Sequence, residues 1–201
     1  MNVYCETNFF LEIVFSHEQA KFCEKIISFC RKKKIELIIP AYSFAESLYR
    51  LEGQRKERAN FQRELNSQLS QLTRTSQYTS QIKIFRALDT FLTQNIEEEK
   101  KRFEKYRKTL TNIAEILVFD AKTINEARQI ESKYNLTLQD AIIFSSILAH
   151  LKKNKHSQSL FLNRNSKDFS TTDIKAKLKT LNCKFIPSFK DGYSFISTQI
   201  T

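Results

Sequence analysis

Four acidic residues lie at points where the chain should pass from one secondary-structure element to the next. They are Glu6, Glu46, Asp140 and Asp168. The chain is otherwise basic, with 33 Lys and Arg against 22 Asp and Glu and a net charge of +11. Carboxylates gathered in one place repel one another, so some of them must bind protons or a cation. A hard divalent cation, Mg²⁺ or Mn²⁺, is the expected occupant, and it would face a polyanionic substrate.

The basic charge is concentrated towards the end of the chain. Residues 151–201 contain ten Lys and Arg and three Asp and Glu, a net charge of +7, whereas residues 111–150 have a net charge of −2. Such an excess favours RNA, DNA or an anionic membrane surface as a partner. The alternative is a lysine-rich surface that is only solvated.

Composition excludes several classes of protein. With 201 residues and 41% hydrophobic content, we expect one compact domain with an elaboration. Gly and Pro number two each, which predicts long helices and excludes glycine-rich phosphate loops. The cysteines form no C-x-x-C pair, the histidines do not cluster at zinc-ligand spacing, and no run is long and apolar enough to span a membrane. We therefore expect a reduced, cytoplasmic protein that is not a membrane protein.

Short apolar runs alternate with helical patterns along the chain. The apolar spacing predicts helices near His17–Lys33, in Ala121–Tyr134, after the cap residue Thr137 and near Thr172–Leu181. The pattern over residues 52–110 predicts an antiparallel helical hairpin. The expected strands are Asn2–Cys5, Glu36–Ile39, Ile116–Phe119, Ser159–Leu162 and Lys184–Pro187. This alternation predicts an α/β fold with a parallel sheet.

The four acids should meet at one edge of that sheet. Glu6 and Asp168 follow expected strands, Glu46 lies two turns into the helix after the second strand, and Asp140 is in the first turn of the helix that Thr137 caps. Functional groups collect at the carboxyl ends of parallel strands, so all four could reach one cleft. Each also has a structural interpretation, since Asp140 and Asp168 suit helix starts and Glu46 suits a solvated face.

These residues resemble the PIN-domain nucleases. The resemblance rests on a strand followed by acid-Thr-Asn, Pro-x-x-x-x-x-Glu, a Leu-x-x-x-Asp-Ala helix and Phe-Leu-Asn-Arg-Asn-x-x-Asp-Phe, and it covers roughly 1–51 and 116–190. It implies a three-layer α/β/α sandwich with a central parallel sheet, a single PIN-like domain over 1–201, and residues 52–110 as an inserted helical hairpin. It also implies cleavage of RNA with Mg²⁺ or Mn²⁺.

The resemblance assigns a role to each position. Glu6, Asp140 and Asp168 would hold the metal, and Glu46 would complete the catalytic site directly or through a water. The supporting residues would be Asn8, Asn163 and Asn165, and the substrate-binding residues Arg164 and Lys167. Two positions depart from the family pattern: Glu6 stands where Asp is usual, and Asn165 is a neutral amide where a fourth acidic ligand could belong.

Three functions follow as hypotheses. The first is an endoribonuclease that hydrolyses phosphodiester bonds in single-stranded or structured RNA. The second is an RNA-binding module of the same fold with weakened or lost catalysis, suggested by Glu6 and Asn165. The third is the toxin of a toxin–antitoxin pair, with the hairpin as a docking surface for an antitoxin protein. A homodimer with a shared basic groove is a further expectation by analogy with the family.

Overall fold

The computed structural model describes residues 1–74, 79–154, 158–164 and 166–200, without the side chains of residues 79–83, 166 and 167. The chain divides into two compact units. The sheet unit comprises Met1–Ser47 and Lys105–Thr201, and the hairpin unit comprises Leu48–Glu104. Residues 75–78, within the expected hairpin, lie outside the described residues.

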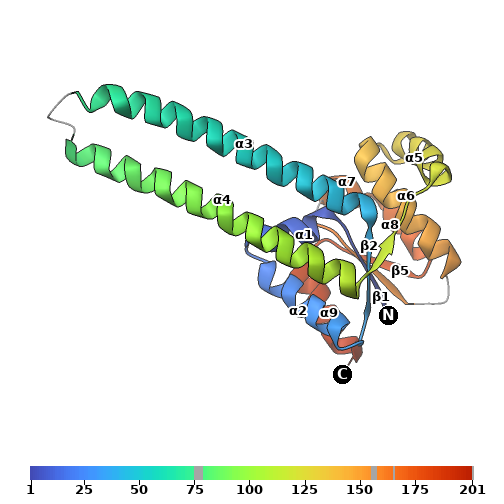
Figure 1. The fold of residues 1–201 in the computed structure, drawn as a ribbon. Coiled ribbons are helices and arrows are strands. Elements are labelled where there is room, and N and C mark those ends of the chain that lie inside the picture. The colour runs from blue at the N-terminus through green and yellow to red at the C-terminus, as the bar shows by residue number, and fades with distance from the viewer. Residues whose placement is uncertain (75–78, 155–157, 165, 201) are drawn as a thin grey trace. The chain divides into compact units, whose positions relative to one another are not determined.

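The strands described in the sheet unit form one five-stranded parallel sheet (Figure 1). They are β1 (Asn2–Cys5), β2 (Glu36–Pro40), β3 (Glu115–Leu117), β4 (Ser159–Leu162) and β5 (Cys183–Ile186). The order is β3-β2-β1-β4-β5, so β1 is central and pairs with both β2 and β4. The carboxyl ends of three neighbouring strands therefore meet beside Glu6, the residue that follows β1.

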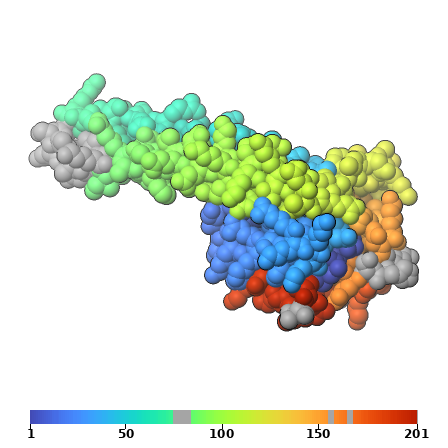
Figure 2. All heavy atoms as spheres, turned by 60° about the horizontal axis from the view of Figure 1, so that its bottom comes forward, coloured from blue at the N-terminus to red at the C-terminus, as the bar shows by residue number. Residues whose placement is uncertain are grey.

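Helices cover both faces of the sheet. Those of the sheet unit are α1 (Thr7–Val14), α2 (Ala20–Arg31), α5 (Ala121–Tyr134), α6 (Leu138–Lys153), α7 (Ser166–Phe169), α8 (Thr172–Lys179) and α9 (Phe189–Ile200). Successive strand side chains point to opposite faces, so Tyr4 and its neighbour Val3 lie in different layers. Helices α5 to α8 pack on the face of Tyr4, while α1, α2 and α9 cover the other face, where α2 and α9 lie side by side (Figures 1 and 2).

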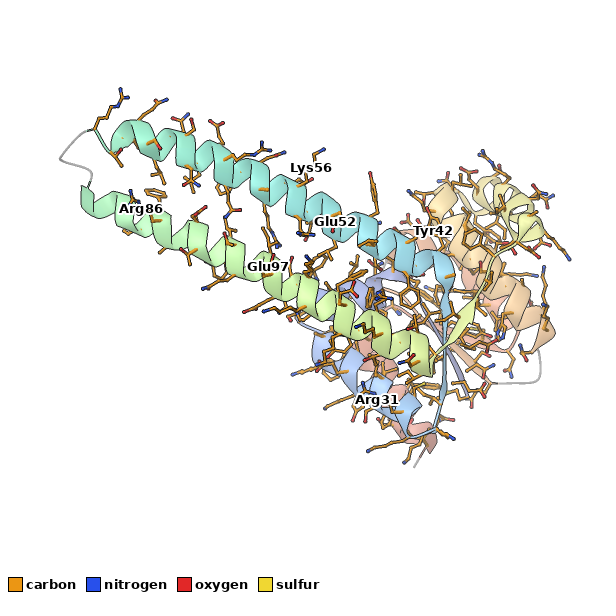
Figure 3. The ribbon with its side chains drawn as sticks, in the orientation of Figure 1. Arg31, Tyr42, Glu52, Lys56, Arg86 and Glu97 are labelled. Atoms are coloured by element: carbon orange, nitrogen blue, oxygen red, sulfur yellow. The ribbon has the colours of Figure 1, made fainter. Side chains whose placement is uncertain are left out.

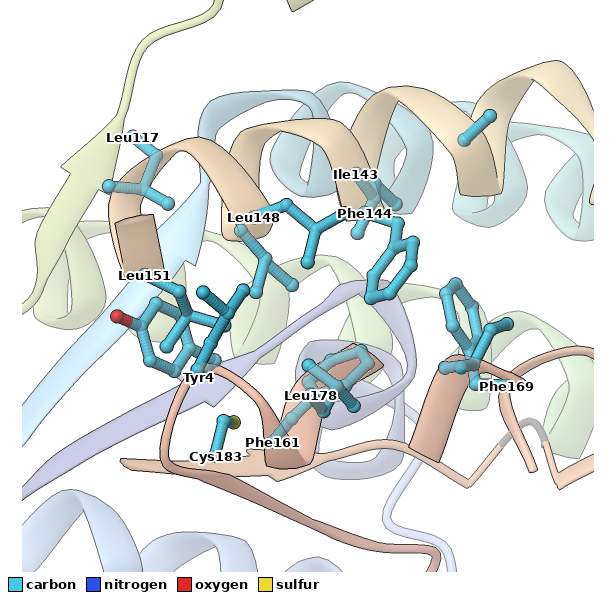
Figure 4. Packing of buried hydrophobic residues seen from close by; sticks show 14 of the residues in the cluster. Tyr4, Leu117, Ile143, Phe144, Leu148, Leu151, Phe161, Phe169, Leu178 and Cys183 are labelled. Atoms are coloured by element: carbon cyan, nitrogen blue, oxygen red, sulfur yellow. The ribbon is translucent and has the colours of Figure 1, made fainter. Parts of the chain in front are cut away.

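The core on the Tyr4 face is built around α6. This helix is apolar on nearly all sides, and Ile143, Phe144 and Ile147 are fully buried. The ring of Phe169 in α7 packs edge-on against Phe144 and Phe161, with centroids 5.7 and 5.5 Å apart (Figure 4). Burying a side chain of this size contributes about 2 kcal/mol. The contact fixes α7 between α6 and β4.

Polar contacts join the two helices of the hairpin unit. It contains most of α3 (Ala41–Leu72) and α4 (Thr79–Ile113), whose side chains meet between the two helices (Figure 3). Arg58 donates to Glu99 at 2.7 Å and to Asn95 at 2.8 Å, and Gln62 donates to the Asp89 carboxylate at 3.0 Å. Only 2% of Glu99 is exposed, so its ion pair is largely removed from water.

The predicted fold class is confirmed: a parallel sheet lies between two helical layers, with an added helical hairpin. The strand β1 and the cap residue Thr137 also lie as predicted. The third strand begins one residue earlier than expected, and α9 was not predicted. Among the described residues, none of the helices combines the length and apolar character needed to cross a membrane.

Candidate functional site

Glu6 ends β1 and begins α1. Its backbone is extended (φ −130°, ψ −167°), and its side chain caps the helix by accepting the backbone N–H of Asn8 at Oε1 over 3.0 Å. Only 4% of the residue is exposed. The predicted first acid is therefore a buried carboxyl group at the carboxyl edge of the sheet, held in place by a helix terminus.

The pKa of Glu6 is raised from 4.5 to about 8. Burial is the largest cause, because removal from water disfavours the charged form. The backbone N–H and side chain of Asn8 lower the pKa in part, while the carboxylates of Glu46 and Asp140 raise it. The fold thus brings two of the other predicted acids, Glu46 and Asp140, close enough to act on Glu6.

Glu46 is positioned by a residue adjacent to Glu6. The hydroxyl of Thr7, which is 1% exposed, donates to Glu46 Oε2 at 2.5 Å. A ring contact between Phe10 and Phe44, with centroids 5.6 Å apart, joins α1 to the start of α3. One helical turn before Glu46, the pKa of Tyr42 is raised by burial and by the Glu46 charge.

Thr7 and Tyr42 are the site residues that the sequence analysis did not assign. Thr7 could have been found as the middle residue of the acid-Thr-Asn motif. Tyr42 could have been found from its i,i+4 spacing to Glu46, which places two side chains on one helix face.

Asp140 lies in the first turn of α6, beside the residue that caps this helix. Thr137 caps the helix and accepts the Asp140 backbone N–H at 3.2 Å. The Thr137 hydroxyl also donates to Asp140 Oδ2 at 2.8 Å. The cap is therefore provided by Thr137, and the Asp140 carboxylate acts instead on the site, where it raises the pKa of Glu6.

The segment after β4 contains the remaining predicted residues. Asn163 is fully buried, and its backbone N–H donates to the carbonyl of Ile186 at 3.3 Å. Asp168 is in α7, next to the buried Phe169. Asn165 and the Lys167 side chain lie outside the described residues, so their assigned roles stay predictions.

Arg164 joins this segment to the α1–α2 connection. Its guanidinium donates to Glu12 Oε2 and to Glu18 Oε1, each at 2.7 Å, and Glu12 is only 3% exposed. Glu12 also accepts the backbone N–H of Gln19 at 2.6 Å. These contacts fix the segment that leads to Asp168, and the substrate-binding role of Arg164 stays a prediction.

The site has the donor chemistry of a hard divalent cation but not a completed ligand set. Carboxylate, amide and hydroxyl oxygens are the ligands that Mg²⁺ and Mn²⁺ prefer. Within the described residues, however, no three His, Cys, Asp or Glu side chains are grouped so that they could hold a metal ion. Glu46 and Asp140 are instead hydrogen-bonded to Thr7 and Thr137. The residue types therefore fit a cation, although the described side chains do not form a ligand set.

Comparisons with known proteins identify the family. Residues 3–169 match the family model described as PIN domain, which is more than half of the chain. The comparison with curated proteins found no match, and neither did the comparison with solved structures. The match includes all four acids and the whole segment of the helical hairpin.

Proposed function

Because the chain belongs to the PIN-domain family, whose members are generally nucleases, we propose that it is a metal-dependent endoribonuclease. The observation that carries the proposal is the buried Glu6 carboxyl, whose pKa is raised to about 8 with the charges of Glu46 and Asp140 beside it. Negative charges placed beside a buried carboxyl at a sheet edge repel it, and this costs stability unless a proton or a cation neutralises the charge. A divalent cation is the simplest ligand that relieves their repulsion.

The residues take distinct parts in this proposal. Glu6, Asp140 and Asp168 would hold Mg²⁺ or Mn²⁺, which when bound polarises a phosphate and lowers the pKa of a water. Glu6 would hold the cation in its deprotonated form, with its carboxylate oriented by the Asn8 backbone N–H. Thr7 and Thr137 position the carboxylates of Glu46 and Asp140 by hydrogen bonds. Water attack at phosphorus would leave a 5′-phosphate and a 3′-hydroxyl.

RNA is the proposed substrate because of the charge of the chain. The chain has a net charge of +11, and such an excess of Lys and Arg attracts the phosphates of a polyanion. The proposal extends to single-stranded and structured RNA.

The test is cleavage of a structured and an unstructured RNA with Mg²⁺, with Mn²⁺ or with EDTA. Asp140→Asn should abolish cleavage and leave folding intact, because Thr137 still caps α6. The matched control is Asp173→Asn, which changes an acid in the first turn of α8, another helix capped by a Thr, without touching the carboxylate site. Cleavage by Asp140→Asn at the wild-type rate would contradict the assignment.

A second candidate is an RNA-binding module of the same fold with weakened or lost catalysis. It is favoured by the absence, within the described residues, of an assembled set of metal-binding side chains, and by a Glu at the position where the family has Asp. Salt-sensitive RNA binding without turnover in either metal would support this candidate.

A further inference from the structure

A lysine-lined pocket lies at the other end of the sheet from the carboxylates. It encloses about 430 Å³ beside β5, at the amino ends of β4 and β5. Its lining comes from both of these strands, from α8 and α9, and from the residues just before the strands. The lining residues are Gln158, Ser159, Lys175, Lys179, Asn182, Cys183, Lys184, Phe185 and Phe195.

The charge of this lining has a single sign. Lys175, Lys179 and Lys184 contribute three cations, and all three residues are exposed to solvent. In the part of the chain that the structure describes, no Asp or Glu contributes to the pocket. Three like charges around one concavity repel one another, and an anion that enters is attracted by all three.

The rest of the lining suits a phosphate group. Asn182 and Gln158 offer amide N–H donors, and the Lys184 ammonium lies 4.2 Å from the centroid of the Phe195 ring. That cation–π contact holds the ammonium at the pocket without neutralising it. β5 is an edge strand, so part of its backbone N–H groups also face away from the sheet.

We propose that this lysine-lined pocket binds the phosphates of an RNA strand at a site separate from the carboxylates, a proposal that rests on RNA being the ligand of this protein. β4 runs from the pocket at Ser159 to the carboxylate edge at Leu162, about 10 Å for three steps at strand rise. A strand of several nucleotides reaches both ends. The pocket therefore adds affinity for longer RNA and takes no part in the chemistry.

The test is the affinity for a single-stranded RNA of about 20 nucleotides, a length that exceeds typical single-strand sites. Binding is measured in EDTA over a series of salt concentrations, so that no metal or turnover is required. Lys175, Lys179 and Lys184 are replaced together by Gln. The matched control replaces Lys21, Lys32 and Lys34, which are exposed lysines on and after α2. Both variants lose three positive charges.

The pocket variant should bind about tenfold or more weakly. The slope of log affinity against log salt concentration should fall by about 0.7 for each phosphate that the protein no longer neutralises. The control should stay close to wild type. Equal affinities for the two variants, whether unchanged or equally reduced, would overturn the proposal. In the wild-type protein, RNA should also protect the three pocket lysines from acetylation and leave the control lysines reactive.

Failure here is distinguishable from failure of the nuclease assignment. If RNA binds at the pocket but is not cleaved in the presence of metal, the nuclease proposal is contradicted and the pocket proposal is supported. If cleavage depends on Asp140 but the pocket variant binds RNA as well as the control does, the nuclease proposal is supported and the pocket proposal is contradicted.

Discussion

Replacing Glu6 by Gln should change how the stability of the metal-free protein depends on pH. The pKa of this carboxyl rises from 4.5 to about 8 in the folded state, so the folded protein binds its proton more tightly than the unfolded chain does. Between these values the wild type loses stability as the pH rises, because folding must retain a proton that the unfolded chain releases. Gln is neutral throughout and keeps an oxygen for the Asn8 N–H, so it removes this dependence.

The size of the effect follows from the shift. A difference of about 3.5 pKa units at about 1.36 kcal/mol each gives an upper limit near 5 kcal/mol between pH 4.5 and pH 8. The contribution of the Glu6 proton to the free energy of unfolding is fully present below pH 4.5 and is lost as the pH passes 8. Relative to wild type, Glu6→Gln should therefore gain stability by up to about 1.4 kcal/mol for each pH unit in that window.

Urea unfolding in EDTA at several pH values between 5 and 8 measures the difference directly. The control is Glu36→Gln, at an exposed residue of β2. Its free energy of unfolding should change with pH in the same way as that of the wild type. If the free energy of unfolding of Glu6→Gln has the same pH dependence as that of the wild type, then Glu6 does not retain its proton in the folded state. The reasoning about the carboxylate site then fails. Adding Mg²⁺ or Mn²⁺ should stabilise the wild type more as the pH rises towards 8, because only the deprotonated carboxyl binds a cation.

Three further predictions concern packing and the hairpin unit, and a fourth concerns the cysteines. Gly192→Ala should cost about 1–3 kcal/mol, since its new Cβ would lie 2.5 Å from a methyl of buried Leu162. Gly53→Ala should instead stabilise by about 1 kcal/mol, because open space surrounds this helical position; thermal unfolding checks both variants. Glu99→Ala should destabilise the hairpin unit by about 3 kcal/mol, as it leaves Arg58 without its buried carboxylate, and loss of helical circular dichroism on heating measures this. The four buried cysteine thiols, whose pKa values are all raised by burial, should react with a thiol reagent only after denaturation.

Local pattern was enough to predict most elements of the sheet unit. The apolar run Asn2–Cys5 and the cap at Thr137 depend on neighbours a few residues away, and both lie as expected. Helix α9 could have been predicted in the same way, since Phe189, Tyr193 and Ile196 keep helical spacing. The start of β3 could not, because it is set by pairing of Glu115 with Ile38 in β2, far away in the sequence.

The sequence by itself determined which residues could do chemistry, because acids next to strand ends and helix starts are visible as local patterns. Only the tertiary structure decided which of them act on one another. The central place of β1 between β2 and β4 buries Glu6, and the charges of Glu46 and Asp140 then raise its pKa. The same holds for Arg164, whose partner Glu12 is 152 residues away. Burial and electrostatic coupling depend on distances through space, which strand order sets and local sequence does not.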